Sequence, residues 1–334
     1  MPALAVAEAL KAEGADVVFV GGERAERELV PAAGYELRPL KVAPLPRRRP
    51  LAGLRAVAMD VRAVRMAEVM LAELKPSAAL GAGGYVAGPL GLAAVLHRVP
   101  LVLMEADSHM GLANRVLSPL ARRVCLAFPA SRRSARRYLV TGRPVPPPAT
   151  DRAAARARFG IAPEETTVVV FGGSQGARSI NRAAVEAFAG AQFRVLHAAG
   201  TRDLNELEPP GPHYDLRGYI DNFGEALLAA DLVVARAGGS IFEIAAHGRP
   251  AVLIPYPHAT ADHQFENARY MEQAGAAVIL PDRELTPARL AQEVGGLLAD
   301  RGRLEAMARA SATLSRPDAA RTIAAEVLAA ARSR

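Results

Sequence analysis

Short apolar runs alternate with stretches of helical periodicity along almost the whole chain. Many of these runs are rich in β-branched residues, which is typical of buried strands. Strands and helices that alternate in this way form parallel sheets covered by helices, so we predict an α/β fold. The predicted strands are Val17–Val20, Ala78–Leu80, Leu101–Met104, Val124–Ala127, Thr167–Phe171, Arg194–His197, Leu232–Ala235, Ala251–Ile254 and Ala277–Leu280.

Helices are predicted near both ends of the sequence. Apolar residues between Ala3 and Leu10 recur at helical spacing, Pro2 suits the first helical turn, and Gly14 is a stop signal. A second helix is predicted after residue 318, because its apolar residues fall on one face. That face comprises Ala319, Ile323, Val327 and Ala330.

The proline-rich stretch Thr141–Thr150 interrupts the alternation. Its sequence, TGRPVPPPAT, can continue neither a helix nor a central strand, so we interpret it as a linker between two α/β domains. We assign residues 1–143 plus 316–334 to the first domain and residues 144–315 to the second. Such domains bind ligands at the carboxyl ends of their strands, so glycine-rich loops should line a cleft between them.

The chain carries 41 Lys and Arg against 34 Asp and Glu, a formal net charge of +7. This excess attracts phosphate groups of nucleic acids, anionic lipids or phosphorylated substrates, although a genome that favours arginine explains it equally well. No aromatic residues interleave the basic runs and no zinc-finger spacing occurs, which argues against nucleic-acid binding. The runs are Arg47, Arg48 and Arg49, and Arg132, Arg133, Arg136 and Arg137.

The single cysteine, Cys125, excludes an intramolecular disulfide and fits a reducing compartment. The uncharged stretch Ala78–Leu96 is long enough to suggest a membrane span, but its glycines and Pro89 divide it into strand, loop and helix. We therefore predict no transmembrane helix, and we see no secretory signal in residues 1–10.

The sharpest candidate site lies in TTVVVFGGSQGARSIN, which begins at Thr166. A predicted buried strand leads into Gly172-Gly173-Ser174-Gln175-Gly176, and a helix follows. Glycines let a phosphate approach the backbone, free N–H groups at a helix start favour it, and Ser174 adds a hydroxyl donor. The spacing matches neither a Walker A motif nor the usual dinucleotide fingerprint. The alternative is a tight turn that needs glycine for its geometry alone.

Two further glycine-rich loops follow predicted strands. Gly238-Gly239-Ser240 precedes a helix whose first turn holds Glu243. This carboxylate can accept hydrogen bonds from a ribose diol, or it is only a favourable charge at a helix N-terminus. In the first domain, Gly83-Gly84-Tyr85 is placed to hold a second phosphate.

Polar side chains gather in PYPHATADHQFENA, residues 255–268. Two histidines and an aspartate there suggest a metal, but no HExxH motif is present. We therefore predict sugar recognition and no metal. The polar residues are His258, Asp262, His263, Gln264 and Asn267.

Together these loops resemble the MurG family, whose members are two-domain GT-B glycosyltransferases. They transfer N-acetylglucosamine from UDP-GlcNAc to lipid I, which gives lipid II for peptidoglycan. The resemblance covers nearly the whole chain, and GGSQGAR after a strand is its most specific part. The other matching stretches are PALAVAEAL, GAGGYVAGPLGLAA, GLANRVL, GYIDN, EIAAHGRPAVLIPYP and DHQFENA.

The resemblance implies that the second domain binds the donor, UDP-GlcNAc. Ser174 and its neighbours would hold the pyrophosphate, the Ile220 backbone the uracil, and Glu243 the ribose. Gln264 and Asn267 would hold the sugar hydroxyls. The implied donor-binding residues are Gly173, Ser174, Gln175, Gly176, Ile220, Gly238, Gly239, Ser240, Glu243, Gln264 and Asn267, with Arg143 and Asp107 as further candidates.

The resemblance also implies that the first domain binds the lipid-linked pyrophosphate through Gly83, Gly84, Tyr85 and Asn114. Family members are peripheral proteins of the cytoplasmic membrane face, held by an apolar patch rimmed by basic residues. Val42–Leu54 is the candidate patch here. The implied partners are UDP-GlcNAc, lipid I, the membrane surface, and cell-wall synthesis and division proteins, with no cofactor.

Several positions depart from the family pattern. In the family, a strand and a Gly-Gly-Thr-Gly-Gly-His loop precede the helix that begins here at Pro2. We expect that this sequence starts after them and lacks the loop histidine, a candidate base. The usual His-Glu-Gln-Asn reads Met104-Glu105-Ala106-Asp107. The usual Gly-Asn-Pro-Val-Arg reads Gly142-Arg143-Pro144-Val145-Pro146, so the expected donor-contacting arginine is missing, and Arg143 is a candidate to reach the same place.

The family reaction is an inverting displacement at the anomeric carbon. It needs a base for the acceptor hydroxyl, and backbone N–H groups with a helix end can stabilise the leaving UDP without a metal. Glu105 and His109 are candidate bases by type and location, unless Glu105 pairs with an arginine and His109 is an ordinary surface residue. The alternative functions are transfer to another lipid or small acceptor, and UDP-sugar binding without catalysis.

Overall fold

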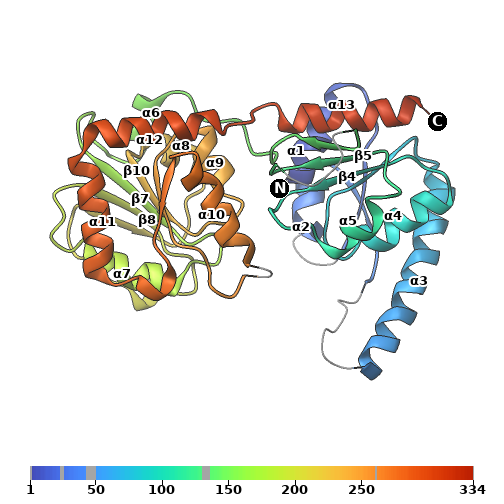
Figure 1. Cartoon of the computed structure of the whole chain (residues 1–334), viewed down its shortest axis with the longest axis horizontal. Coiled ribbons are helices and arrows are strands. Elements are labelled where there is room, and N and C mark those ends of the chain that lie inside the picture. Colours follow the sequence, from blue (N-terminus) through green and yellow to red (C-terminus); the bar gives the residue numbers. More distant parts are fainter. Residues whose placement is uncertain (1, 23–25, 43–49, 130–135, 260–261, 334) are drawn as a thin grey trace. The chain divides into compact units, whose positions relative to one another are not determined.

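The computed structural model describes residues 2–22, 26–42, 50–129, 136–259 and 262–333, and for residues 50–60 it describes the backbone only (Figure 1). The chain divides into two compact units. Unit 1 comprises Met1–Val145 and Asp318–Arg334, and unit 2 comprises Pro146–Pro317. The stretch Thr141–Thr150 contains neither helix nor strand.

Unit 2 is built on a six-stranded parallel sheet. Its strands are β7 (Thr167–Phe171), β8 (Arg194–Ala198), β9 (Tyr214–Arg217), β10 (Leu232–Ala235), β11 (Ala251–Leu253) and β12 (Ala277–Ile279). They lie in the order β12-β11-β10-β7-β8-β9. The chain therefore runs outward from β7 to β9, returns to the other side of β7, and runs outward again to β12. The direction reverses between β7 and β10, and ligands of such sheets bind at this switch point.

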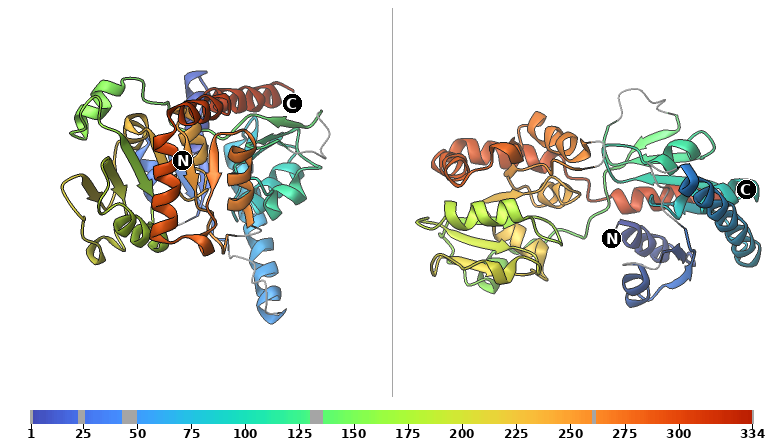
Figure 2. Two further views of the ribbon diagram at one scale, coloured as in Figure 1. Left: turned by 60° about the vertical axis from the view of Figure 1, so that its left-hand side comes forward. Right: turned by 90° about the horizontal axis from the view of Figure 1, so that it is seen from below.

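Helices cover both faces of this sheet (Figure 2). On one face Val168 and Val170 of β7 pack against Ile180, Leu290 and Val294, all of them fully buried. Each such side chain contributes roughly 1.5–3 kcal/mol of transfer free energy. The helices are α6 (Arg152–Arg158), α7 (Arg178–Ala187), α8 (Phe223–Ala229), α9 (Ile241–Ala246), α10 (His263–Gln273), α11 (Pro287–Ala299) and α12 (Arg301–Thr313), with single 3-10 turns η1 (Leu204–Glu206) and η3 (Asp282–Glu284).

Unit 1 contains two separate parallel sheets among its described residues, β1-β2 and β3-β4-β5-β6. Their strands are β1 (Val18–Gly21), β2 (Glu36–Pro39), β3 (Ala79–Gly81), β4 (Leu101–Glu105), β5 (Arg123–Leu126) and β6 (Tyr138–Val140). The helices are α1 (Pro2–Ala12), α2 (Glu26–Ala32), α3 (Pro50–Leu74), α4 (Ala87–Leu96), α5 (Leu112–Leu117) and α13 (Ala319–Arg332).

The C-terminal helix α13 belongs to unit 1, where it lies beside α1 (Figure 1). Ile323 of its apolar face packs with Val6 of α1 and with Val102 and Met104 of β4. The face predicted from helical periodicity is thus the face that is buried, because burial of these side chains fixes the helix against the sheet.

Each predicted strand is present with closely agreeing ends, but the sequence analysis missed β2, β6 and β9. All three lie at an edge of their sheet. They have three or four residues each, of which only Tyr214 is buried, so no long apolar run marks them. The edge strands β1, β3 and β12 are apolar and were predicted. Ala78–Leu96 forms β3, a loop and α4. Across the described ranges, none of the helices combines the length and apolarity needed to span a bilayer.

Candidate functional site

The loop between β7 and α7 leaves the sheet at the switch point. Gly173, Ser174 and Gln175 are exposed. The Gly176 N–H donates to the Gly173 carbonyl at 2.9 Å, which closes a turn. Gly173 and Gly176 have φ of 91° and 72°, a left-handed backbone that favours glycine.

This loop is packed against the loop that follows β8. A Cβ on Gly176 would lie 2.0 Å from the Ala199 carbonyl oxygen, and one on Gly200 would lie 2.5 Å from the Gly176 nitrogen. A Cβ on Gly172 would lie 2.3 Å from that of Ala177. By contrast, nothing lies within 4 Å of a Cβ built on Gly173. Packing therefore explains three of the glycines, whereas the space at Gly173 is open to a ligand.

The loop ends at the N-terminus of α7. Its N-cap residue is Ala177, which offers no side-chain acceptor to the first-turn N–H groups. Such groups, together with the positive end of the helix dipole, favour an anion. The exposed Ser174 hydroxyl lies in the same loop. The arrangement can therefore bind a phosphate.

A buried polar network supports the loop from within unit 2. His197 lies at the end of β8, hydrogen-bonded to the Tyr214 hydroxyl at 2.8 Å and to Asn181 Oδ1 at 3.1 Å. Asn181 Nδ2 donates to the Ala199 carbonyl at 2.8 Å. Burial lowers the pKa of His197 to about 4, so the ring is neutral at pH 7. This network fixes the carbonyl on which Gly176 packs.

Asp203 extends this network toward the surface. Its Oδ2 accepts from Asn181 at 3.3 Å, and its Oδ1 pairs with Arg178 at 3.0 Å and Arg202 at 3.3 Å. Burial acts to raise the pKa of Asp203, but the hydrogen bonds from the two arginines outweigh it and lower that pKa. The side chain is therefore a carboxylate that anchors the first turn of α7.

Arg236 directly follows β10 and precedes the second glycine loop. It is 8% exposed, and its Nη1 donates to the carbonyls of Ile254 at 3.1 Å and Pro255 at 3.2 Å. The same nitrogen lies 2.6 Å from Asp282 Oδ1, and Nη2 donates to Ser179 Oγ at 2.7 Å. Arg236 thus ties together the carboxyl ends of β10 and β11 and the start of α7.

The sequence analysis missed both Arg236 and the His197 network. A signal for Arg236 was available, since DLVVARAGG places a charge at the end of an apolar strand. An arginine there must find acceptors within the protein because the surrounding positions are buried. No local signal identified the partners of His197, because they come from α7 and β9.

The predicted sugar-binding residues gather at the second glycine loop, Gly238-Gly239-Ser240. Glu243 lies in the first turn of α9 and is partly buried. Gln264 Oε1 accepts from the Tyr256 N–H at 3.0 Å, and its Nε2 lies 4.0 Å from a Cβ built on Gly238. Asn267 is 1% exposed and donates to the Ala237 carbonyl at 3.0 Å, so it supports the loop from beneath.

Ile220 lies between β9 and α8 at another loop of the same sheet edge. Its side chain is 3% exposed, whereas the neighbouring Tyr219 is 63% exposed. The buried side chain fixes the backbone of this turn. The segment is thus available for contacts through its backbone, which is the predicted use.

In unit 1, Glu105 ends β4 and organises the loop after it. Its Oε2 accepts from the Gly111 N–H at 2.9 Å and from Asn114 Nδ2 at 3.0 Å, and its Oε1 accepts from the Asp107 N–H at 3.3 Å. Asn114 also donates to the Met104 carbonyl at 3.0 Å and is 1% exposed. The partners of Glu105 are thus backbone N–H groups and an amide, not the arginine considered from the sequence.

The other first-domain candidates lie on or beside this loop. His109 is exposed, and its Nε2 accepts from Arg115 at 3.2 Å. Arg143 donates to the Ala106 carbonyl at 3.1 Å and lies 3.6 Å from Asp107. Within unit 1, therefore, Arg143 and Asp107 come together next to Glu105.

The loop Gly83-Gly84-Tyr85 connects β3 to α4 in unit 1. Gly83 and Gly84 have φ of 83° and 79°, and a Cβ on either would meet nothing within 4 Å. Tyr85 is 60% exposed. Here glycine is required by backbone conformation and not by packing.

Within the part of the chain that the structure describes, no cluster of three His, Cys, Asp or Glu side chains is arranged to hold a metal ion. His258 packs its ring edge-on against Tyr256, with ring centres 5.6 Å apart.

Comparison with known proteins agrees with this architecture. The model of the glycosyltransferase family 28 N-terminal domain matches residues 1–126, and that of the family's C-terminal domain matches residues 167–323. A Moorella thermoacetica protein is 42% identical, with 96% of this chain and 93% of that protein covered. A Rubrobacter xylanophilus protein is 41% identical, with 98% and 99% covered. Both are named UDP-N-acetylglucosamine--N-acetylmuramyl-(pentapeptide) pyrophosphoryl-undecaprenol N-acetylglucosamine transferase.

Solved structures of glycosyltransferases also resemble this chain. The crystal structure of Acinetobacter baumannii MurG matches with a TM-score of 0.81 and 27% identity, covering 98% of this chain and 95% of that one. CalG4, the calicheamicin glycosyltransferase, matches with a TM-score of 0.69 at 20% identity, which shows the shared GT-B fold alone. The chain belongs to glycosyltransferase family 28 and, within it, to the MurG family.

Proposed function

We propose that this protein transfers N-acetylglucosamine from UDP-GlcNAc to lipid I, with inversion at the anomeric carbon and without a metal. The observation that carries the proposal is the pair of glycine loops on either side of the β7/β10 switch point. One of them opens onto the N-terminus of α7, where backbone N–H groups favour a diphosphate. The relatives named above carry the same activity in their names.

The donor occupies unit 2 in this proposal. The pyrophosphate lies over Gly173 and Ser174, where space is open, and Glu243 accepts hydrogen bonds from the ribose diol. Gln264 reaches the sugar from beside Gly238, and Asn267 holds the Ala237 carbonyl next to the second glycine loop. Arg236 and the His197 network keep the two loops in place before the donor arrives, which lowers the cost of ordering them on binding.

The acceptor occupies the carboxyl edge of the β3–β6 sheet in unit 1, at Gly83-Gly84-Tyr85. The acceptor hydroxyl attacks the anomeric carbon while the bond from that carbon to UDP breaks, and a base receives the hydroxyl proton. The N–H groups of the β7–α7 loop stabilise the negative charge that develops on UDP. Glu105 already accepts three hydrogen bonds, so we assign it to positioning the loop that carries His109.

We further propose that unit 1 contacts the membrane through an apolar face on α4 and α5, which pack together. The earlier candidate, Val42–Leu54, falls largely outside the described residues. Arg98, Arg115 and Arg122 lie close in sequence to the apolar face and match the charge of anionic lipids. The apolar side chains, all between 40% and 62% exposed, are Leu92, Leu96, Leu112, Val116 and Leu120.

The function is tested by incubating the protein with UDP-GlcNAc and lipid I in the presence of a chelator. Formation of lipid II at an undiminished rate is expected. Binding of UDP-GlcNAc without product from lipid I would contradict the acceptor assignment, and activity that requires an added divalent metal would contradict the proposed mechanism.

The donor site is tested with Glu243→Gln, and the matched control is Glu272→Gln, an exposed position on α10. Loss of the charged acceptor should weaken UDP affinity about tenfold, since hydrogen bonds to charged groups contribute about 1.5–3 kcal/mol. The control should bind UDP like the parent protein. Equal affinity of both variants, measured by calorimetry, would remove Glu243 from the ribose site.

The membrane face is tested with Leu112→Ser, and Leu29→Ser on α2 is the control, because Leu29 is also an exposed leucine. Weaker flotation with phosphatidylglycerol vesicles is expected for Leu112→Ser alone. If both variants float like the parent protein, α4 and α5 are not the membrane face.

A further inference from the structure

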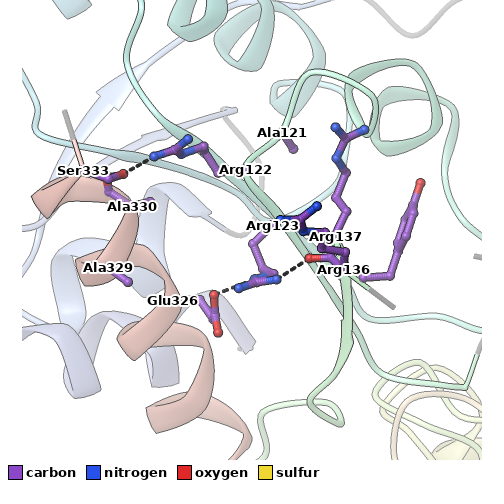
Figure 3. Close-up of a pocket in the computed structure, with 10 residues that line it drawn as sticks. Ala121, Arg122, Arg123, Arg136, Arg137, Glu326, Ala329, Ala330 and Ser333 are labelled. Carbon is purple, nitrogen blue, oxygen red and sulfur yellow. Dashed lines mark hydrogen bonds and ion pairs between the residues drawn. The ribbon is translucent and has the colours of Figure 1, made fainter. Parts of the chain in front are cut away.

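We propose that unit 1 has a second anion site, a pocket that binds a phosphate group away from both substrates (Figure 3). The pocket has a volume of about 770 Å³. It is lined by the starts of β5 and β6 and by the last turns of α13. The lining residues are Ala121, Arg122, Arg123, Arg136, Arg137, Tyr138, Glu326, Ala329, Ala330 and Ser333.

The pocket lies at the amino edge of the β3–β6 sheet. Arg122 and Arg123 are at the start of β5, and Arg137 directly precedes β6. In a parallel sheet all strand starts lie at one edge and all strand ends at the other. Gly83 follows β3 and Glu105 ends β4, so both lie at the opposite edge of the sheet. The site is thus separate from the proposed acceptor loop and does not depend on the proposed transferase activity, but it shares Arg122 with the proposed membrane face.

The positive charge of the pocket is only partly neutralised. Arg123 pairs through Nε with Glu326 at 2.7 Å, and its Nη1 donates to the Arg136 carbonyl at 2.6 Å (Figure 3). Arg122 donates to the neutral Ser333 hydroxyl. Among the described residues, no carboxylate pairs with Arg122, Arg136 or Arg137. Four arginines against one glutamate leave a formal charge of +3 on the lining.

The exposed arginines of the pocket suit a phosphate group. Arg136 and Arg137 are exposed at neighbouring positions, and guanidinium groups bind phosphate with two parallel hydrogen bonds. Arg123 is held at the pocket wall by Glu326, so one donor group is already ordered. Because the pocket is concave, a ligand there is less exposed to screening by salt than on a flat surface.

A neighbouring cavity of about 620 Å³ shares Arg122 and Ser333 with this pocket. Its wall adds Arg98 and apolar residues such as Val95 and Leu120. The combined surface accepts a phosphate that carries an apolar group as well as a free phosphate. The headgroup of an anionic lipid and a soluble phosphate compound share this chemistry, so the experiment separates them.

The test uses the full chain with the double substitution Arg136→Ser and Arg137→Ser. The matched control is Arg301→Ser with Arg303→Ser, two exposed arginines of α12 in unit 2 that change the net charge equally. Binding of inorganic pyrophosphate is measured by calorimetry for both variants, which keep the proposed donor site unchanged, so a difference between them reports on the pocket. Binding of phosphatidylcholine vesicles with and without phosphatidylglycerol is measured in parallel.

We expect about tenfold weaker binding for the Arg136/Arg137 variant and unchanged binding for the control, because two charge-assisted contacts are lost. Loss in the pyrophosphate arm identifies a soluble phosphate ligand, and loss confined to the phosphatidylglycerol arm identifies a lipid headgroup. Equal binding of the two variants in both arms would overturn the proposal. A further variant, Arg136→Lys with Arg137→Lys, keeps the charge and should recover part of the affinity if the phosphate is the ligand.

Discussion

The two units offer similar glycine loops that are held in different ways. In each, a short strand leads through glycines with positive φ into a helix. In unit 2, Gly172 and Gly176 of the β7–α7 loop and Gly200 of the loop after β8 are packed so closely that a Cβ on any of them would lie 2.0–2.5 Å from other atoms. In unit 1 a Cβ on Gly83 or Gly84 would meet nothing within 4 Å.

This difference separates a preformed loop from one that packing leaves unconstrained. The unit 2 loop is fixed by Ala199, and Ala199 is fixed by Asn181 and His197. Its N–H groups therefore keep their orientation without a ligand, as charge stabilisation in a reaction requires. Packing does not constrain Gly83 and Gly84 of the unit 1 loop, so a ligand that binds there must itself order the loop.

The largest expected effect comes from alanine at Gly176. The new methyl group would collide with the Ala199 carbonyl and would also force a left-handed alanine, so unfolding free energy should fall by about 3 kcal/mol or more. The same substitution at Gly83 places the methyl group in open space and should lower the free energy of unfolding by only about 1 kcal/mol. Urea unfolding of the two variants measures both. Equal losses would contradict the contrast between the loops.

Acid should weaken unit 2 through His197. The folded pKa of about 4 lies below the unfolded value of 6.5, so the unfolded chain binds the extra proton first. Stability is therefore lost as pH falls from about 6.5 to 4, by about 3 kcal/mol in total. Unfolding measured across this range should show the loss in the parent protein and in the control His258→Asn. His197→Asn should be less stable at pH 7 and should lose less on acidification.

Removing Arg236 should loosen the sheet edge on which both donor loops depend. Arg236→Met removes the ion-pair partner of Asp282, which keeps its hydrogen bond from Ser179, and frees two carbonyl groups. We therefore expect the free energy of unfolding to fall by about 2 kcal/mol and UDP binding to weaken. Arg217→Met removes a partly exposed pair with Asp215 and should lower the free energy of unfolding by less than about 1 kcal/mol. If the two variants lost equal stability and kept equal UDP affinity, Arg236 would have no positioning role.

The smallest effect concerns local opening in unit 1. Among the described residues its β1-β2 sheet has two strands, whereas β4 and β5 lie inside a four-stranded sheet. Two-stranded sheets are marginally stable, so the amides of β1 should exchange with solvent faster than those of β5 and of β7. Hydrogen exchange of the native protein measures this order. Slower exchange in β1 than in β5 would show that β1-β2 is supported by more than its own pairing.

The sequence by itself determined the buried strands, the glycine loops and the apolar face of α13, and the loops sufficed to identify the family. These features depend on residues close together in the chain, where periodicity and glycine spacing report local conformation directly. The edge strands β2, β6 and β9 were missed because they are short and only Tyr214 among their residues is buried, so no long apolar run marks them.

Only the tertiary structure decided the partners of the polar side chains. Arg236 meets Asp282 and Ser179, Glu105 meets Gly111 and Asn114, and Arg122, which precedes β5, meets Ser333 after α13. Each of these groups is satisfied by atoms that the fold brings together from other elements. A charged or polar group must find such partners when it is buried, but spacing along the chain does not reveal which ones.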